Sequence, residues 1–171
     1  MGQRVRTLEL AVRLLDADPQ TEVVATSTTW RNKPIGAAQG WFLNGAVRVR
    51  TQHAARGLLS LCKDVEARVG RRSSPHWGDR AVDLDLLLYG DKIASGVGLR
   101  VPHPRMLERP FVMVPAAQVA PGWIHPVNGT RLDQLCEFDT PGLIAHGMLP
   151  SVVAEHPRPK YTHRASQAHT T

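Results

Sequence analysis

Two aspartates that stand one residue apart are the strongest local candidates for chemistry. Asp83 and Asp85 open the apolar run DLDLLLY. In an extended strand, side chains at positions i and i+2 point to the same side, so both carboxylates project together. Two like charges held this close are costly unless a cation lies between them, and oxygen ligands suit Mg²⁺, which shares its shell with water and phosphates. The alternatives are a solvated pair or a salt bridge to the nearby Arg80.

A second cluster of candidates lies downstream, where nine residues hold His103, Arg105, Arg109 and Phe111. This stretch offers one imidazole, two guanidinium groups and an aromatic ring. Guanidinium groups match phosphate oxygens in a fixed fork, so the cluster is suited to a phosphorylated ligand. The alternative is a basic surface loop whose aromatic ring lies in the core.

A third candidate pair lies in the strand-like stretch FLN. There Phe42 and Asn44 share one side of the chain. They would offer a ring for stacking and an amide that can both donate and accept hydrogen bonds. Such alternation is also common in strands that serve structure alone.

The charge distribution points to an anionic ligand. The 171 residues carry a net charge of +6, and residues 31–80 alone contain ten basic residues against three acidic ones. A basic middle attracts polyanions, either nucleic acid or a polyphosphate ligand, although it is equally compatible with a merely basic surface. The sequence contains no phosphate-binding G-x-x-x-x-G-K-[ST] loop and no G-x-G-x-x-G motif.

Composition limits the class of protein. With 42% hydrophobic and 21% charged residues, the chain can bury a core and resembles neither a membrane protein nor a disordered acidic chain. No apolar run approaches the ~20 residues that span a bilayer, and the N-terminus has no secretory pattern. Cys62 and Cys136 have no metal-ligand spacing and are too few for a disulfide framework. We therefore expect a cytoplasmic protein.

The pattern of apolar residues predicts one α+β domain over residues 1–150. Helices are expected over residues 3–16 and 54–69, with short ones at 105–108 and 111–119, and strands over 22–30, 41–50 and 81–90. This order is a ferredoxin-like βαββαβ antiparallel sheet with helices on one face and with its first strand absent. Residues 151–171 are polar and proline-rich, which predicts a disordered tail.

Four sequence segments together resemble one enzyme family. They are TTWRNKPIGAAQGWFLNGAV, VEARVGRR, WGDRAVDLDLLLYGD and LRVPHPRMLERPFVMVPAAQVAP. In this order they resemble 6-hydroxymethyl-7,8-dihydropterin pyrophosphokinase, over about residues 2–135. The resemblance implies transfer of the β,γ-pyrophosphoryl unit of ATP to the hydroxymethyl oxygen of the pterin, with release of AMP, in folate biosynthesis. It further implies a monomer with ATP and the pterin as its partners, and with no nucleic acid or membrane.

The resemblance also implies roles for individual residues. Asp83 and Asp85 would hold two Mg²⁺ ions and, with Arg71 and Arg80, would be catalytic. Phe42, Asn44 and Phe111 would bind the pterin. The ATP-binding residues would be Glu66, Trp77, His103, Arg105 and Arg109.

The chain departs from the family pattern at four places. The family's first strand is missing, and only Met1-Gly2-Gln3-Arg4 matches the end of its motif, so we expect the natural protein to be longer at this end. A loop arginine of the family is Ser73 here, its Thr-Pro is Asn32-Lys33, and a proline is Asp79. Two alternatives to an active enzyme stay open.

One alternative is a degenerate family member that binds ATP or pterin without useful turnover. The other is a nucleic-acid-binding ferredoxin-like domain, suggested by the basic charge. That class usually carries stacking aromatic residues in a strand motif that this sequence lacks.

Overall fold

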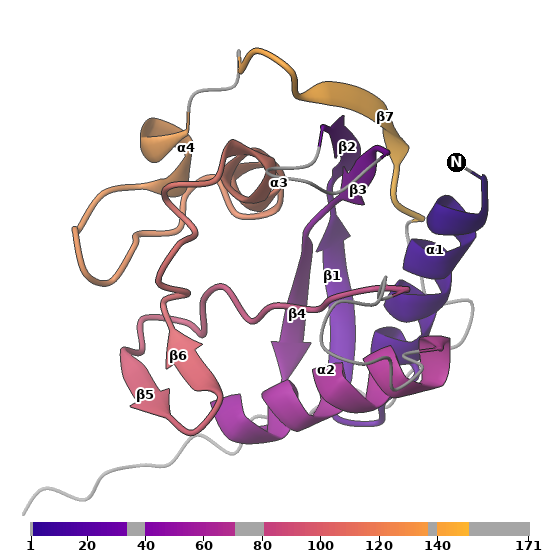
Figure 1. Cartoon of the computed structure of the whole chain (residues 1–171). Helices are drawn as coiled ribbons and strands as arrows, with labels where there is room; N and C mark the ends of the chain where they lie inside the picture. The colour runs from indigo at the N-terminus through magenta and orange to yellow at the C-terminus, as the bar shows by residue number, and fades with distance from the viewer. Residues whose placement is uncertain (1, 34–39, 71–80, 137–139, 151–171) are drawn as a thin grey trace, which may run out of the picture.

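The computed structural model describes residues 2–33, 40–70, 81–136 and 140–150 (Figure 1). Arg71, Trp77 and Arg80 lie outside the described residues, as does the predicted tail. Helices and antiparallel sheets are both present, so the predicted α+β class is confirmed. The elements in chain order are α1 Gly2–Asp16, β1 Thr21–Thr26, β2 Thr28–Asn32, β3 Phe42–Asn44, β4 Val47–Thr51, α2 Ala55–Val69, β5 Ala94–Gly96, β6 Leu99–Val101, α3 Pro110–Val119, α4 Leu132–Leu135 and β7 Ile144–Met148.

The two long helices form where the apolar period predicts them. In α2, Leu58, Cys62 and Val65 recur at helical spacing and are buried. The helix ends at Gly70, whose φ of 112° is left-handed and therefore suits a residue without a Cβ atom. None of the helices among the described residues is long and apolar enough to span a membrane.

The predicted strand over residues 22–30 is divided into β1 and β2 at Ser27. The Ser27 N–H donates to the Ala46 carbonyl over 3.0 Å, and the Ser27 hydroxyl accepts from the Ala46 N–H over 2.8 Å. Because the partner strand is interrupted at the same place, β1 pairs with β4 while β2 pairs with β3 and with β7. The strands therefore form separate small sheets, together with the hairpin of β5 and β6, instead of one continuous sheet.

The prediction of a strand over residues 81–90 is wrong. In this stretch no residue belongs to a strand. Among the described residues, the only backbone–backbone hydrogen bond of residues 82–88 is the one that the His103 N–H donates to the Leu87 carbonyl, over 2.8 Å. A strand is defined by its ladder to a neighbour, and no described strand lies alongside this stretch to provide one.

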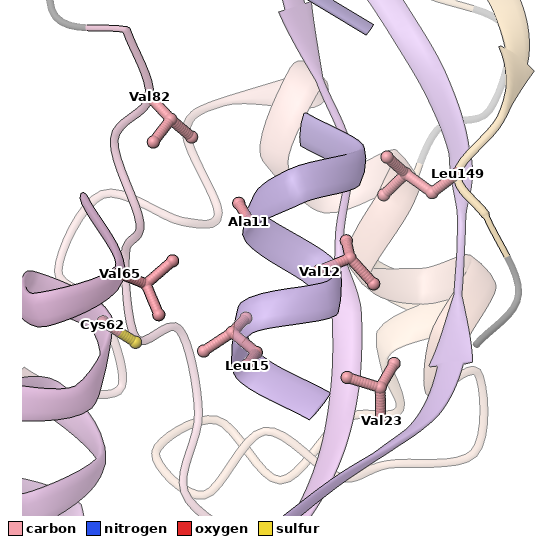
Figure 2. Packing of buried hydrophobic residues seen from close by; sticks show 8 residues of the cluster. All are labelled: Ala11, Val12, Leu15, Val23, Cys62, Val65, Val82 and Leu149. Carbon is pink, nitrogen blue, oxygen red and sulfur yellow. The ribbon is translucent and has the colours of Figure 1, made fainter. Parts of the chain in front are cut away.

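The core consists of two clusters of buried apolar side chains. The first gathers around α1, as Figure 2 shows: Val65 of α2 and Val82 lie to one side of this helix, and Val23 and Leu149 to the other. The second cluster joins α3, α4 and the stretch before α3, with Met106 and Leu132 almost fully buried. The separation of these clusters places a cavity between the elements that carry them, as described below.

Candidate active site

The two aspartates lie on the wall of a cavity of about 630 Å³. The side chains of Asp83 and Asp85 are 53% and 46% exposed, so both carboxylates can reach a ligand or water. The Lys63 Nζ atom lies 3.9 Å from Asp83 Oδ1, and the His103 Nε2 atom lies 4.0 Å from Asp85 Oδ2. Each carboxylate thus has a nitrogen near it while keeping an accessible face.

A buried carboxylate fixes the backbone between these aspartates. Glu66 of α2 has no exposed surface, and its Oε1 atom accepts a hydrogen bond from the Leu84 N–H over 2.7 Å. The same oxygen accepts from Lys63 Nζ over 2.8 Å. Because Leu84 stands between the two aspartates, this bond anchors both of them to α2. The resemblance implies that Glu66 binds ATP, and this role stays a prediction.

Four more of the expected site residues line the same cavity. They are Phe42 and Asn44 on β3, and Arg109 and Phe111 at the start of α3. The Phe42 residue is 46% exposed, and the Arg109 guanidinium lies 6.0 Å from the centre of the Phe111 ring. One cavity therefore brings together the carboxylate pair, a guanidinium group, two aromatic rings and an amide.

The orientation of the Asn44 amide is set by its neighbours on β2. Its Nδ2 atom donates to the Asn32 side-chain oxygen over 2.6 Å and, more weakly, to the Trp30 carbonyl over 3.4 Å. The amide nitrogen is thus engaged within the β2–β3 hairpin. Its oxygen remains the atom that can accept a hydrogen bond from a ligand.

Two further residues that the resemblance implies as ATP ligands belong to the described chain, His103 near the cavity and Arg105 away from it. His103 Nδ1 accepts a hydrogen bond from the Arg105 N–H over 3.2 Å, which directs its other nitrogen toward Asp85. The Arg105 side chain is 60% exposed and lies 3.4 Å from Glu108. Neither residue lines the cavity, so the structure brings His103 next to the site through Asp85 and leaves Arg105 outside it.

The carboxylate pair is chemically suited to Mg²⁺. Both side chains are oxygen donors at the edge of a cavity and are open enough to leave room for water. Among the described residues, no group of three or more His, Cys, Asp or Glu side chains could hold a metal ion. An ion held by these two carboxylates alone would take its remaining ligands from water and phosphate, as Mg²⁺ commonly does.

Sequence reasoning missed Lys63 as a member of the site. Its Nζ atom lies within 4.0 Å of both Glu66 and Asp83, and therefore links the buried carboxylate to an exposed one. Its spacing of three residues from Glu66 on a predicted helix could have identified it, because such pairs are neighbours on a helix surface.

Comparisons with known proteins show the family of the chain. Residues 1–121 match the family model for 7,8-dihydro-6-hydroxymethylpterin-pyrophosphokinase. Proteins named 2-amino-4-hydroxy-6-hydroxymethyldihydropteridine pyrophosphokinase are similar over most of the chain. The protein from Methylorubrum extorquens is 38% identical over 144 residues, covering 84% of this chain and 90% of its own length. The one from Synechocystis sp. is 36% identical over 137 residues, covering 80% and 70%, and that from Bacillus subtilis is 38% identical over 135 residues, covering 78% and 81%.

Proposed function

The chain belongs to the 7,8-dihydro-6-hydroxymethylpterin-pyrophosphokinase family, and on that premise we propose that it transfers a pyrophosphoryl unit from ATP to the hydroxymethyl group of 6-hydroxymethyl-7,8-dihydropterin. The hydroxymethyl oxygen attacks the β-phosphorus of ATP and loses its proton. The bond from that phosphorus to the α,β-bridging oxygen breaks, and AMP leaves. The observation that carries the proposal is the single cavity that joins the carboxylate pair to two rings, an amide and a guanidinium.

The pterin is proposed to lie between Phe42 and Phe111. Both rings line the cavity, one from β3 and one from α3, and flat heteroaromatic rings stack favourably on aromatic side chains. The Asn44 oxygen, left available by the bonds of its nitrogen, would accept from an N–H group at the edge of the pterin. These contacts would fix the direction in which the hydroxymethyl group points.

The triphosphate is proposed to lie at the other polar groups of the cavity. Asp83 and Asp85 would hold Mg²⁺, which would neutralise phosphate charge and help to orient the reacting groups. Arg109 lines the same cavity and offers a guanidinium to phosphate oxygens. Phosphoryl-type transfer depends mainly on such positioning and charge neutralisation, so the rigidity of the aspartate-bearing backbone matters directly.

Lys63 and Glu66 would act as positioning residues. The Glu66 bond to the Leu84 N–H holds the backbone of the aspartate pair, and Lys63 lies between the buried carboxylate and Asp83. Neither residue needs to touch substrate for this role. Any chemistry at Asp83 and Asp85 would then depend on α2.

The direct test is AMP formation by the 171-residue chain from ATP, Mg²⁺ and the pterin. We expect Asp83→Ala and Asp85→Ala each to lower turnover by at least ~10²-fold, since electrostatic stabilisation of the transferring group is lost. Asp91→Ala is the matched control, because Asp91 is an aspartate just downstream whose side chain is 89% exposed, and it should keep full activity. Circular dichroism checks that each variant folds.

Unchanged turnover in both aspartate variants would contradict the assignment of the carboxylate pair. If the wild-type chain binds the pterin but releases no AMP, the degenerate alternative is favoured. That alternative has one structural observation behind it, because the aspartates lie on a stretch without a strand ladder.

A separate prediction concerns the proposed stacking. Phe111→Ala should weaken pterin binding by roughly 10-fold, about 1.4 kcal/mol, because an aromatic stacking partner is lost. The affinity for ATP should change much less. Isothermal titration with each ligand measures both, and equal losses for the two ligands would contradict the stacking role.

A further inference from the structure

Gln118 is the only polar residue of α3, whose sequence is PFVMVPAAQV. The helix residues from Met113 to Ala117 are buried in the core, whereas Gln118 is exposed. Figure 1 shows α3 beside β2 and β3, and residues of the helix contact both strands. The proposed chemistry does not use the Gln118 amide, so its presence on an otherwise apolar helix needs a separate explanation.

One oxygen atom of Gln118 joins α3 to β2. Its Oε1 atom accepts hydrogen bonds from the Thr28 backbone N–H and from the Trp30 indole N–H, each over 3.2 Å. Among the described residues, these are the only hydrogen bonds between α3 and the β2–β3 hairpin. Apolar packing is non-directional, whereas hydrogen bonds depend on distance and angle. Gln118 is therefore the contact that can fix the position of α3 relative to β2.

On the strand side, this contact leads directly to the β3 residues of the cavity. Trp30 pairs with Asn44 in the β2–β3 ladder, and the Trp30 carbonyl accepts from Asn44 Nδ2 over 3.4 Å. Phe42 pairs with Asn32, two residues further along β2. Because a ladder keeps paired residues in register, a displacement of Trp30 would move both Asn44 and Phe42.

On the helix side, the same contact leads to Phe111. Phe111 and Gln118 stand seven residues apart on α3, which is about two turns, so they lie on one face of the helix and about 10 Å apart along its axis. Phe111 lines the cavity, and Gln118 does not. Gln118 thus attaches to β2 the helix whose other end carries one of the two aromatic rings of the site.

We propose that Gln118 is a positioning residue, which sets the gap between Phe42 and Phe111 in which the pterin ring stacks. A ring that is contacted on both faces needs a gap of fixed width, because dispersion contacts weaken steeply when surfaces separate. A binding site has to be held to within about 0.5 Å by the residues that support it. The inference rests on the proposed function, since it takes the pterin as the ligand, and it adds a residue outside the cavity.

The first test is the kinetics of Gln118→Leu in the full 171-residue chain. The change keeps the approximate size of the side chain and removes the acceptor, so the KM for the pterin should rise about 5-fold. The KM for ATP and kcat should change less than about 2-fold, because the aspartate pair is anchored to α2 and not to α3. Gln134→Leu is the matched control, since Gln134 of α4 is exposed and its side chain makes no hydrogen bond within the described residues. It should leave both KM values unchanged.

Two further variants test whether Gln118 acts through its bonds to β2. Gln118→Glu keeps an acceptor oxygen and should hold the KM for the pterin within about 2-fold of the wild type. Trp30→Phe keeps a ring and removes the indole N–H. In that background Gln118→Leu should raise the KM for the pterin by only about 2-fold, because one of its two bonds is already absent. Equal increases in both backgrounds would contradict the action of Gln118 through Trp30.

Binding measured without turnover separates this inference from the proposed reaction. Isothermal titration with the pterin in the presence of α,β-methylene-ATP, whose methylene bridge is not cleaved, should show about 5-fold weaker binding to Gln118→Leu than to the wild type. If this difference is found and the wild type releases no AMP from ATP, the proposed reaction is wrong and the role of Gln118 stands. If AMP forms but Gln118→Leu binds the pterin like the wild type, or loses as much affinity for ATP as for the pterin, the role of Gln118 is wrong and the reaction stands.

Discussion

Strand β1 and residues 82–89 are both extended stretches beside a long helix, yet only β1 forms a ladder. The sequence of β1, TEVVAT, is the less apolar of the two, while VDLDLLLY carries more large aliphatic residues. β1 lies next to β4, and its residues pair with those of β4 from Thr21 to Thr26. Residues 82–89 have no such neighbour in the described chain. Composition thus predicts an extended backbone, but a neighbour decides whether it becomes a strand.

The two stretches are nevertheless attached to their helices in the same way. Asp16 at the end of α1 is buried and accepts a hydrogen bond from the Val23 N–H over 2.9 Å. Glu66 of α2 is buried and accepts from the Leu84 N–H over 2.7 Å. For β1 this bond adds to a ladder, whereas for residues 82–89 it is one of very few fixed points. The loss of each carboxylate should therefore have different consequences.

The largest expected difference between the two regions is in amide exchange. Amides of β1 and β4 that bond within their ladder should exchange at least ~10³-fold more slowly than those of residues 85–88, because only the former must open a paired and packed sheet. Exchange followed residue by residue by NMR measures this directly. Similar protection in both regions would show that residues 82–89 are paired in solution. It would contradict the expected difference between β1 and this stretch.

The next largest effect is expected from Glu66→Ala. The change leaves the Leu84 N–H without its acceptor and should lower the free energy of unfolding by about 1–3 kcal/mol. It should also lower AMP formation strongly, because the backbone between Asp83 and Asp85 loses its anchor. Urea denaturation and the turnover assay measure the two effects.

Asp16→Ala is the matched control for this pair. It removes the bond to Val23 and should lower the unfolding free energy by a similar amount, while turnover of the folded fraction is retained. Glu66→Gln keeps an oxygen acceptor and should restore part of the lost turnover. If Asp16→Ala and Glu66→Ala lower turnover equally, Glu66 has no positioning role.

The smallest effect concerns Cys62, which lies on α2 and lines the cavity. Burial raises the pKa of its thiol to about 11 from an ordinary value of 9.0. Above pH 9 the unfolded chain therefore loses this proton more readily than the folded chain, so stability falls as pH rises. Between pH 8 and pH 10 this group should cost about 1 kcal/mol of unfolding free energy. Denaturation at both pH values should show a smaller decrease in Cys62→Ala than in the wild type, and an equal decrease would contradict the assignment.

The two long helices were the most predictable part of the fold, whereas the short helix predicted over residues 105–108 is wrong, because this stretch forms turns. The apolar period gives α2 to within one residue, from 54–69 expected to Ala55–Val69 observed, because such a helix satisfies its own backbone and needs only a buried face. The strands were less predictable. The interruption at Ser27 depends on hydrogen bonds to Ala46, and β7 was not foreseen, since its five residues are all exposed and carry no apolar alternation.

The candidate site, like the fold, could be predicted from the sequence only in part. The spacing of Asp83 and Asp85 and the resemblance together name six residues that line one cavity. The sequence could not show that Glu66 is buried beneath the aspartates, nor that the Asn44 nitrogen is engaged by Asn32. Both facts depend on contacts between elements, which a local pattern does not contain.

Strand β7 has a consequence for the order in which this chain folds. It pairs with β2, and the Thr29 hydroxyl donates to the Gly147 carbonyl across a separation of 118 residues. Contacts this distant along a chain form slowly, because a long loop must close before they contribute. The hairpin of β2 and β3 carries Phe42 and Asn44, and β7 pairs with the edge of β2 that faces away from β3. During synthesis, almost 150 residues must therefore be made before the sheet that contains this hairpin is complete.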